Sequence, residues 1–229
     1  MSKHEDVELI FYYASEMYAM KHHLTKDEVL ALFRRSYVFE HILSQHEYLH
    51  QVSCEEIVEY IESIAKEDRR SLTLYHGTTD VFDEIVLTKS ANRRDFGTGF
   101  YTTVIQSQAL EWASRLAKRR HVLPYYVYEY VYVESDQLKV LRFSEPSGEW
   151  LDFVKDNRIN GGCYHDYDVV IGPVADDKTM LTLQLYVAGV MPKNAAIEEL
   201  RYSLVNNQVS FHTKRAVEHL KLSRRKQYD

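Results

Sequence analysis

The 229-residue chain has two segments that differ in their content of glycine and proline. All eight glycines and all four prolines lie after Leu74. Because these residues are the strongest local breakers of helices and strands, the first segment is free to form uninterrupted regular structure. The asymmetry predicts one domain over residues 1–70 and a second over residues 71–229. The charged run at residues 66–70 is the expected linker.

The first segment has the hydrophobic periodicity of helices. One helical face is traced near the start by Val7, Ile10, Phe11, Ala14, Met17 and Tyr18. Thr25 with Glu28, and Ser53 with Glu56, have the capping-box spacing that opens a helix. An apolar group at residues 38–43 predicts a short helix between them. We therefore expect residues 4–67 to form a compact helical bundle.

The second segment alternates strand-like runs with helices. Strands are predicted over residues 72–76, 99–104, 125–134, 138–143, 169–171 and 208–212. Helices are predicted after caps at Ser107, Ser147 and Asp177, ending at Arg120, Lys155 and Val187, and another with Pro192 in its first turn. The basic tail at residues 221–226 is expected to fray. The fold class expected for the chain is α+β, with an all-α bundle before a mixed domain.

Charge and hydropathy exclude several classes of function. The net charge is -6, from 28 basic and 34 acidic residues, which disfavours broad capture of nucleic acid or anionic membrane. No apolar run approaches the roughly 20 residues that cross a bilayer, and the N-terminus lacks a signal-peptide core. We expect a cytoplasmic protein with no membrane partner. Cys54 and Cys163 have no metal-binding or redox spacing and are expected to be structural thiols.

Two glycine motifs about twenty residues apart suggest the chemistry. The first is Tyr75-His76-Gly77-Thr78, and the second is Phe-Gly-Thr-Gly-Phe-Tyr over residues 96–101. A histidine at a strand end can bond a ribose hydroxyl, and a following glycine lets the backbone approach a carboxamide. The ring of Tyr101 is able to stack on nicotinamide. These residue types suit a site that holds NAD+ for cleavage through an oxocarbenium-like state.

The motifs resemble those of the ADP-ribosyltransferase superfamily, in the His-Tyr-Glu branch that includes diphtheria toxin and the poly- and mono-ADP-ribose polymerases. Residues 74–78 are similar to its His-Gly-Ser/Thr motif, and residues 95–101 to its Phe-Gly-x-Gly-x-Tyr motif. The resemblance implies a split β-sheet domain that uses NAD+ as a substrate, without a metal. Tyr101 and Trp112 would sandwich nicotinamide, and Arg94 with Arg93 would meet the pyrophosphate unless they form a solvated loop pair. The residues expected to bind NAD+ are His76, Gly77, Thr78, Arg94, Gly99, Tyr101 and Trp112.

The third motif of the branch carries a catalytic glutamate, and Gln208 stands in its place. An amide can bond the ribose 2'-hydroxyl but lacks the charge that stabilises an oxocarbenium ion. The expected catalytic set is therefore His76, Tyr101 and Gln208, with mono-ADP-ribosylation as the reaction. A base would come from Asp95, Asp168, Asp176 or Asp177, or from the target. One alternative is an inactive module that binds NAD+ or ADP-ribose, and another is a structural pairing domain without nucleotide.

Two further resemblances concern biological setting. Residues 71–222 resemble an uncharacterised bacterial branch of transferase-like domains associated with toxin-antitoxin and phage-defence systems, on the patterns at residues 166–177 and 207–213. The first segment resembles a small helical family of unknown function found beside such domains, through Tyr48-Leu49-His50. Their fusion implies a regulator or antidote that contacts the transferase domain. The acceptor, a protein or a nucleic acid, has no readable signal.

Residues 46–50, His-Glu-Tyr-Leu-His, match the zincin pattern His-Glu-x-x-His. On a helix this spacing puts two imidazoles on one face, with the glutamate as general base. The flanking sequence indicates a short element, and the candidates for a third ligand are the surface acids Glu55, Glu59 and Glu67. The segment is also too small to form a substrate cleft beside its own core. A solvated helical turn is therefore favoured over a metalloprotease.

Two other patterns have structural interpretations. Along residues 125–134, Val127, Val131 and Val133 share one face, and four tyrosines share the other. Tyrosine is a good strand former, so packing is favoured over binding of bases. The basic residues between 115 and 121 are expected to complement a helix dipole rather than to bind nucleic acid.

Overall fold

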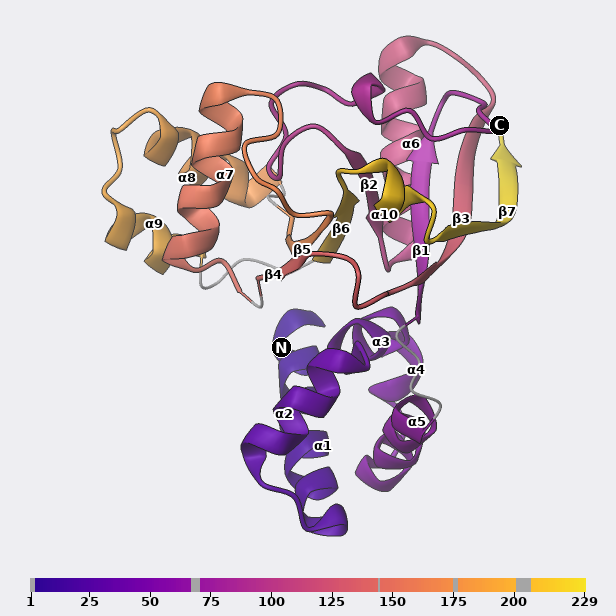
Figure 1. Ribbon diagram of the computed structural model, residues 1–229, viewed down its shortest axis with the longest axis vertical. Helices are drawn as coiled ribbons and strands as arrows, with labels where there is room; N and C mark the ends of the chain where they lie inside the picture. Colours follow the sequence, from indigo (N-terminus) through magenta and orange to yellow (C-terminus); the bar gives the residue numbers. More distant parts are fainter. Residues whose placement is uncertain (1–2, 67–70, 144, 175–176, 201–206) are drawn as a thin grey trace. The chain divides into compact units, whose positions relative to one another are not determined.

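The computed structural model describes residues 3–66, 71–143, 145–174, 177–200 and 207–229 (Figure 1). The chain divides into two compact units, one of Met1–Thr73 with Val131–Ser135 and one of Leu74–Tyr130 with Asp136–Asp229. Most of the predicted linker, and Asp176, lie outside the described residues. None of the described helices is long and apolar enough to cross a membrane.

The first unit contains the predicted helices. They are α1 (Lys3–His22), α2 (Lys26–Arg35), α3 (Val38–Ser44), α4 (His46–Leu49) and α5 (Cys54–Lys66). Both capping boxes are present: Glu28 accepts the Thr25 N–H at 2.8 Å and Glu56 accepts the Ser53 N–H at 3.0 Å, and each cap hydroxyl accepts in return. The inner faces bury Val7, Ala14, Val29, Phe33, Ile42 and Ile61. Tertiary burial of these faces stabilises the helices, of which α2, α3 and α4 are too short to be stable alone.

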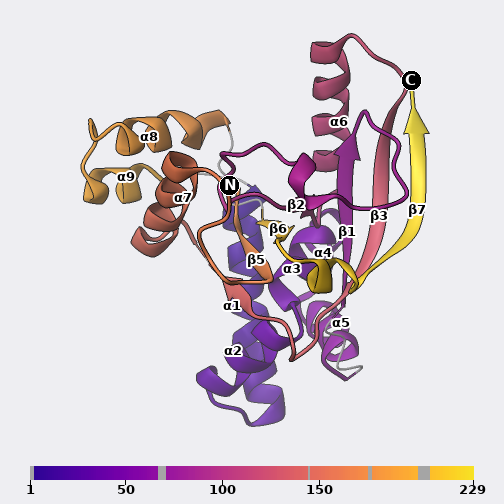
Figure 2. The same cartoon turned by 45° about the horizontal axis from the view of Figure 1, so that its top comes forward.

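The described strands form one seven-stranded sheet (Figures 1 and 2). They are β1 (Ser71–Thr78), β2 (Phe100–Thr103), β3 (Tyr125–Val133), β4 (Val140–Arg142), β5 (Val169–Pro173), β6 (Asn207–Phe211) and β7 (Leu220–Tyr228), in the order β4-β5-β6-β2-β1-β3-β7. A mixed fold of helices and strands was expected and is confirmed. The predicted strands are present, with ends shifted by up to two residues.

The tail was expected to fray, and this prediction is wrong, because it forms the edge strand β7. Ser223 and Arg224 bond the Glu129 carboxylate of β3 at 3.2 and 3.0 Å, and the Tyr228 ring stacks on Tyr125. Its side chains are mostly exposed and four of the nine are basic, as is common on an edge strand, where charge discourages pairing with other chains.

The register brings the three motif strands together. Gln208 of β6 lies opposite Thr103 of β2, and Thr103 lies opposite Tyr75 of β1. Residues directly opposite each other share a face of the sheet, so these three side chains form one row. His76 and Tyr101 lie one and two residues from this row, on β1 and β2. Residues that are up to 133 positions apart in the chain therefore meet at the centre of the sheet.

The helices of the second unit are α6 (Gln106–Arg120), α7 (Gly148–Asn160), α8 (Asp177–Val187), α9 (Lys193–Leu200) and α10 (Lys214–Val217), with a 3₁₀ turn at Leu87–Lys89. The group α7–α9 lies together in both views and packs around Phe96, Trp150, Leu151 and Leu183. The Ser147 hydroxyl caps α7 as predicted. The Ser107 cap is wrong, since α6 begins at Gln106 with Ile105 at its N-cap, and the Thr103 hydroxyl accepts the Ile105 N–H instead.

The tyrosines of β3 have structural partners. Tyr128, Tyr130 and Tyr132 are buried. The Tyr128 ring stacks on Phe82 at 4.4 Å, and its hydroxyl donates to the Phe82 carbonyl and accepts the Phe82 N–H. The structural interpretation of this ladder is therefore confirmed, and Tyr128 anchors the loop that follows β1.

Candidate functional site

Two clefts of the second unit meet at the glycine motifs. Their volumes are about 180 and 480 Å³, and the larger lies within the range of roughly 300–1,000 Å³ that is typical of small-molecule sites. Both clefts are lined by His76, Gly77, Arg94, Tyr101 and Trp112. Thr78 and Gly99 line the smaller cleft, and Gln208 lines the larger. The structure thus brings all eight predicted site residues to these two clefts.

His76 is held in one tautomer by the neighbouring strand. Its Nδ1 lies 2.7 Å from the Tyr101 carbonyl oxygen. A carbonyl only accepts, so Nδ1 carries the proton and Nε2 is an acceptor. Burial lowers the pKa of His76 to about 4, which keeps the imidazole neutral at neutral pH. The ring rests against Phe100 at 4.4 Å, so His76 offers the cleft a fixed, uncharged acceptor suited to a hydroxyl.

Gly77 is required by packing. A Cβ at this position would lie 1.9 Å from the Ala109 carbonyl oxygen of α6. From the sequence, Gly77 is expected to let a ligand approach the backbone, whereas the close contact between β1 and α6 is a sufficient reason for a glycine here. Gly99 is similar, since its Cβ would lie 2.6 Å from the Phe211 carbonyl oxygen of β6. Both glycines place the clefts by letting main chains approach closely.

The Tyr101 hydroxyl closes the glycine loop, which is the segment of residues 96–99 before β2. It donates to the Gly97 carbonyl at 2.6 Å and accepts the Phe96 N–H at 3.1 Å. Burial raises the pKa of this phenol well above its usual range, so it stays protonated. The ring, and not the hydroxyl, is therefore the part of Tyr101 that is available to a ligand. Sequence reasoning gave Tyr101 a stacking role and missed its role in holding the loop.

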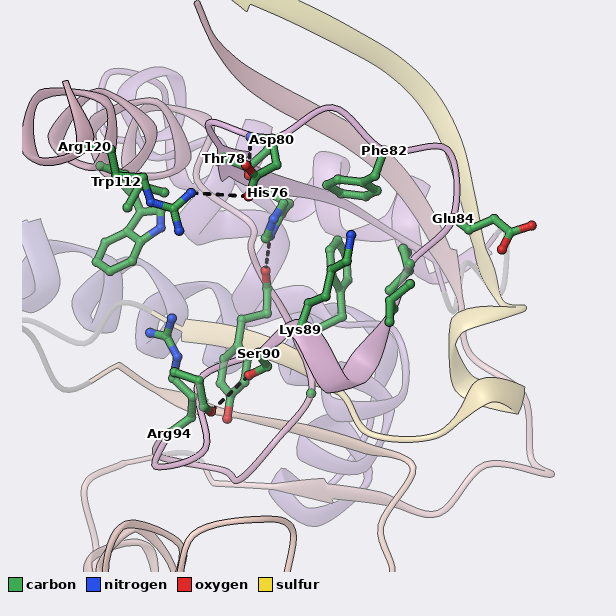
Figure 3. Close-up of a pocket in the computed structure, with 18 residues that line it drawn as sticks. His76, Thr78, Asp80, Phe82, Glu84, Lys89, Ser90, Arg94, Trp112 and Arg120 are labelled. Carbon is green, nitrogen blue, oxygen red and sulfur yellow. Dashed lines mark hydrogen bonds and ion pairs between the residues drawn. The ribbon is translucent and has the colours of Figure 1, made fainter. Parts of the chain in front are cut away.

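Arg94 lies near both predicted stacking rings, and Figure 3 labels it together with Trp112. Its guanidinium carbon is 5.9 Å from the Tyr101 ring centroid and 5.8 Å from that of Trp112. Both distances are within cation–π range. The Arg94 Nε is buried without a hydrogen-bond partner among the described residues. Trp112 is 40% exposed, so the slot beside it opens to solvent.

Gln208 is part of a polar, uncharged row. It is 8% exposed, and its amide donates to the Pro173 carbonyl at 3.3 Å. Next to it, the Thr103 hydroxyl donates to Gln108 Oε1 at 2.5 Å. Gln108, which sequence reasoning missed, lines the same cleft. This wall of the larger cleft offers hydrogen bonds to a ligand but no charge.

The proposed bases have other partners. Asp95 is the one acidic residue among the described lining residues of the larger cleft, and Arg158 bonds its Oδ1 at 2.5 and 2.8 Å. Asp168 lines neither cleft in the part of the chain described. Burial opposes its charge, but bonds from Arg215, Thr213 and the Lys139 N–H outweigh this and lower the pKa of Asp168 to about 2. Asp168 is thus a structural carboxylate. The side chain of Asp177 is not among those described.

Other residues of the smaller cleft were not expected. Arg120 donates to the Thr79 hydroxyl at 2.8 Å and to Asp80 at 3.3 Å, so it ties the end of α6 to the loop after β1. From its position in the sequence, Arg120 is expected only to complement the helix dipole. Thr78 is 6% exposed and its hydroxyl accepts the Asp80 N–H, which leaves the hydroxyl proton for a ligand. Arg120 and Asp80 are 40 positions apart in the chain, so no local sequence pattern indicates their contact.

Comparisons with known proteins give two matches. Residues 72–222 match the model of a family described as protein of unknown function (DUF3990). Residues 11–68 match the model of a second family described as protein of unknown function (DUF3791). No curated protein and no solved structure matches the chain.

Proposed function

The chain belongs to the DUF3990 family of proteins of unknown function, whose model spans residues 72–222, and from the geometry of its clefts we propose that it is an NAD+-dependent mono-ADP-ribosyltransferase. One observation carries the proposal. His76, Tyr101 and Gln208 lie on the adjacent strands β1, β2 and β6, and each lines a cleft. Independent motifs far apart in the sequence therefore converge on one site, as the resemblance to the His-Tyr-Glu branch requires.

In this proposal NAD+ spans the two clefts. The nicotinamide ring stacks between Tyr101 and Trp112, which requires the Arg94 guanidinium to leave that position. The displaced guanidinium then bonds the pyrophosphate, where two parallel N–H donors suit phosphate oxygens. The Nε2 of His76 accepts a hydrogen bond from a ribose hydroxyl, consistent with its neutral state. Aromatic stacking and fixed acceptors orient the dinucleotide without a metal.

The reaction proposed is cleavage of the bond between nicotinamide and ribose. Nicotinamide leaves with the bonding electrons, and a nucleophile of the acceptor bonds the anomeric carbon and loses its proton. Gln208 orients the ribose through its amide, and the transition state has an oxocarbenium-like charge. Because this wall of the cleft is uncharged, transfer is expected to be slow and to stop after one ADP-ribose.

A second candidate is a binding module that holds NAD+ or ADP-ribose without transfer. The replacement of a carboxylate by Gln208 and the pairing of Asp95 with Arg158 favour it. Both features remove negative charge from the place where the oxocarbenium ion would form. The two candidates share the binding site and differ in turnover.

The setting proposed follows from the resemblance. The transferase would act in the cytoplasm in a toxin-antitoxin or phage-defence system, on a protein or nucleic-acid acceptor. The helical unit would contact the transferase and regulate it. Comparing the whole chain with a 71–229 fragment checked for folding by circular dichroism tests this, and equal activity would count against regulation.

Transfer is tested with NAD+ labelled in its adenylate half. The full-length protein, His76→Ala and Trp112→Ala are incubated with cell lysate, followed by protease or nuclease. Lys118→Ala, an exposed change on α6 outside both clefts, is the matched control. The proposal predicts macromolecular label with wild type and Lys118→Ala, and its loss in the other two. NAD+ binding without label would favour the binding module.

A further inference from the structure

Asp6 of α1 and two histidines of the α4 turn converge on one point in the helical unit. Each of Asp6, His46 and His50 offers one ligand atom, and these atoms all lie within 4.8 Å of one another. The Nε2 of His46 is 2.8 Å from Asp6 Oδ2. The rings of His46 and His50 are stacked, with centroids 5.1 Å apart. The favoured sequence interpretation of a solvated turn is wrong for His46, which is only 9% exposed.

We propose that these three residues bind a divalent transition-metal ion, for which Zn²⁺ is the appropriate probe. Two imidazoles and one carboxylate form a common donor set for Zn²⁺, with bonds of about 2.0–2.2 Å and ligand atoms therefore about 3.3–3.6 Å apart in a tetrahedral site. The Asp6 and His46 atoms are already closer than this. His50 is exposed, so its ring is free to close the remaining distance. The fourth position faces solvent and takes water.

The arrangement would let a bound ion crosslink α1 and α4. His46 is buried and its position is fixed by Asp6, which lies 40 residues earlier in the chain. An ion held by both residues would crosslink α1 to α4 and stabilise the bundle, because binding to the folded state alone adds to stability. Glu47 is exposed, and the third ligand, Asp6, precedes the His-Glu-x-x-His motif at residues 46–50 in the chain rather than following it. The site therefore goes beyond the proposed transferase and differs from the metalloprotease that the motif suggests.

A second cluster, Cys163, His165 and His212, also has ligand atoms within 4.8 Å of one another but is less suited to a metal. The Nε2 of His165 donates to the Phe96 carbonyl at 2.9 Å, and its Nδ1 accepts the Tyr167 N–H. The Nδ1 of His212 donates to the Thr98 carbonyl at 3.0 Å. These rings hold the glycine loop, and metal binding would break those bonds. The cluster serves as an internal control.

Titration calorimetry with Zn²⁺ on full-length protein without a histidine tag tests the proposal. We expect one ion per chain, and at least a tenfold loss of affinity in His50→Gln and in Asp6→Asn. Glu47→Gln, Cys163→Ser and the exposed His121→Gln are controls and should bind as wild type does. Because His50 is exposed, His50→Gln should keep the melting temperature of the metal-free protein while losing the increase that Zn²⁺ gives.

Co²⁺ provides a spectroscopic check. A nitrogen–oxygen site gives visible d–d bands without the near-ultraviolet charge-transfer band of a thiolate ligand. The absence of Zn²⁺ binding, unchanged affinity in His50→Gln, or loss of binding in Cys163→Ser would each overturn the proposal. Since these variants lie outside both clefts, their outcome is independent of NAD+ binding.

Discussion

The guanidinium carbon of Arg94 lies 5.8 Å from the ring centroid of Trp112, and both side chains line both clefts. It is also 5.9 Å from the Tyr101 centroid. The cation therefore holds the place that the proposal gives to nicotinamide, and its own place in the complex would be on the pyrophosphate. One residue would exchange partners when NAD+ binds.

Replacement of Arg94 separates these two roles. Arg94→Ala should weaken NAD+ binding by about 10- to 100-fold, because two charge-assisted hydrogen bonds to the pyrophosphate, each contributing about 1.5–3 kcal/mol, outweigh the cost of displacing the guanidinium. The same variant should bind free nicotinamide several-fold more tightly. Nicotinamide then enters between the Tyr101 and Trp112 rings without breaking a cation–π contact, which contributes about 0.5–2 kcal/mol. Calorimetry with both ligands measures the effects. Arg119→Ala, whose guanidinium is 6.0 Å from the Trp112 centroid but outside both clefts, should change neither affinity. Parallel changes for the two ligands would contradict the exchange.

Gln208→Glu tests whether a carboxylate at this position increases the rate of NAD+ cleavage. A charge facing the ribose should stabilise the oxocarbenium-like state and raise the release of nicotinamide from NAD+ by about 10- to 100-fold. Gln108→Glu, in the same cleft, is the matched control and should not accelerate release. Circular dichroism checks that each variant is folded. If Gln208→Glu binds NAD+ as wild type does and is no faster, Gln208 does not occupy the position of a catalytic glutamate.

Tyr101→Phe should destabilise the protein while keeping the stacking ring. It leaves the buried Phe96 N–H without its partner, at a cost of about 1–3 kcal/mol in the free energy of unfolding. Urea denaturation measures this cost. Tyr164→Phe, at a position that is 66% exposed, is the control and should have little effect. Equal stability of Tyr101→Phe and wild type would show that the hydroxyl does not hold the glycine loop.

Acid should weaken the second unit through Asp168. The pKa of this carboxyl is lowered to about 2 in the folded state, below the value of about 3.9 in an unfolded chain. A depressed pKa stabilises the fold above the unfolded value, and this stability is lost as the pH falls from about 4 toward 2. The loss should be about 2 kcal/mol by linkage. Asp168→Asn should be less stable at neutral pH and less sensitive to acid in this window, measured by urea denaturation at each pH. The exposed Asp83→Asn should follow the wild-type profile.

Much of the fold was predictable because its signals are local. Capping boxes at Thr25 and Ser53 and the hydrophobic periodicity of α1 each lie within one helix, and all the corresponding helices are present. The strand β7 was missed because most of its residues are polar or charged, and its pairing depends on Glu129, 95 positions from Arg224. The cap predicted at Ser107 failed because α6 begins earlier, at Gln106, where the hydroxyl of Thr103, three residues before the helix, accepts the Ile105 N–H.

The sequence identified residues that line the two clefts but not the contacts that they make. Glycine spacing identified His76 and Tyr101, since backbone geometry constrains those positions. The ion pair of Asp95 with Arg158 joins residues 63 positions apart, and nothing in linear spacing indicates it. Asp6 and His46 are likewise brought together by tertiary folding across 40 positions of the chain. Tertiary folding decides which charges are neutralised, and that in turn decides which acids are free to act.

Calorimetry of NAD+ with the full-length protein tests the central claim most directly. The account predicts binding of one NAD+ per chain, lost or at least tenfold weaker in His76→Ala and Trp112→Ala and unchanged in Lys118→Ala. Because Trp112 is 40% exposed, its replacement tests the site without removing a core residue. No binding to the wild type, or equal binding by all three variants, would contradict both the transferase and the binding module.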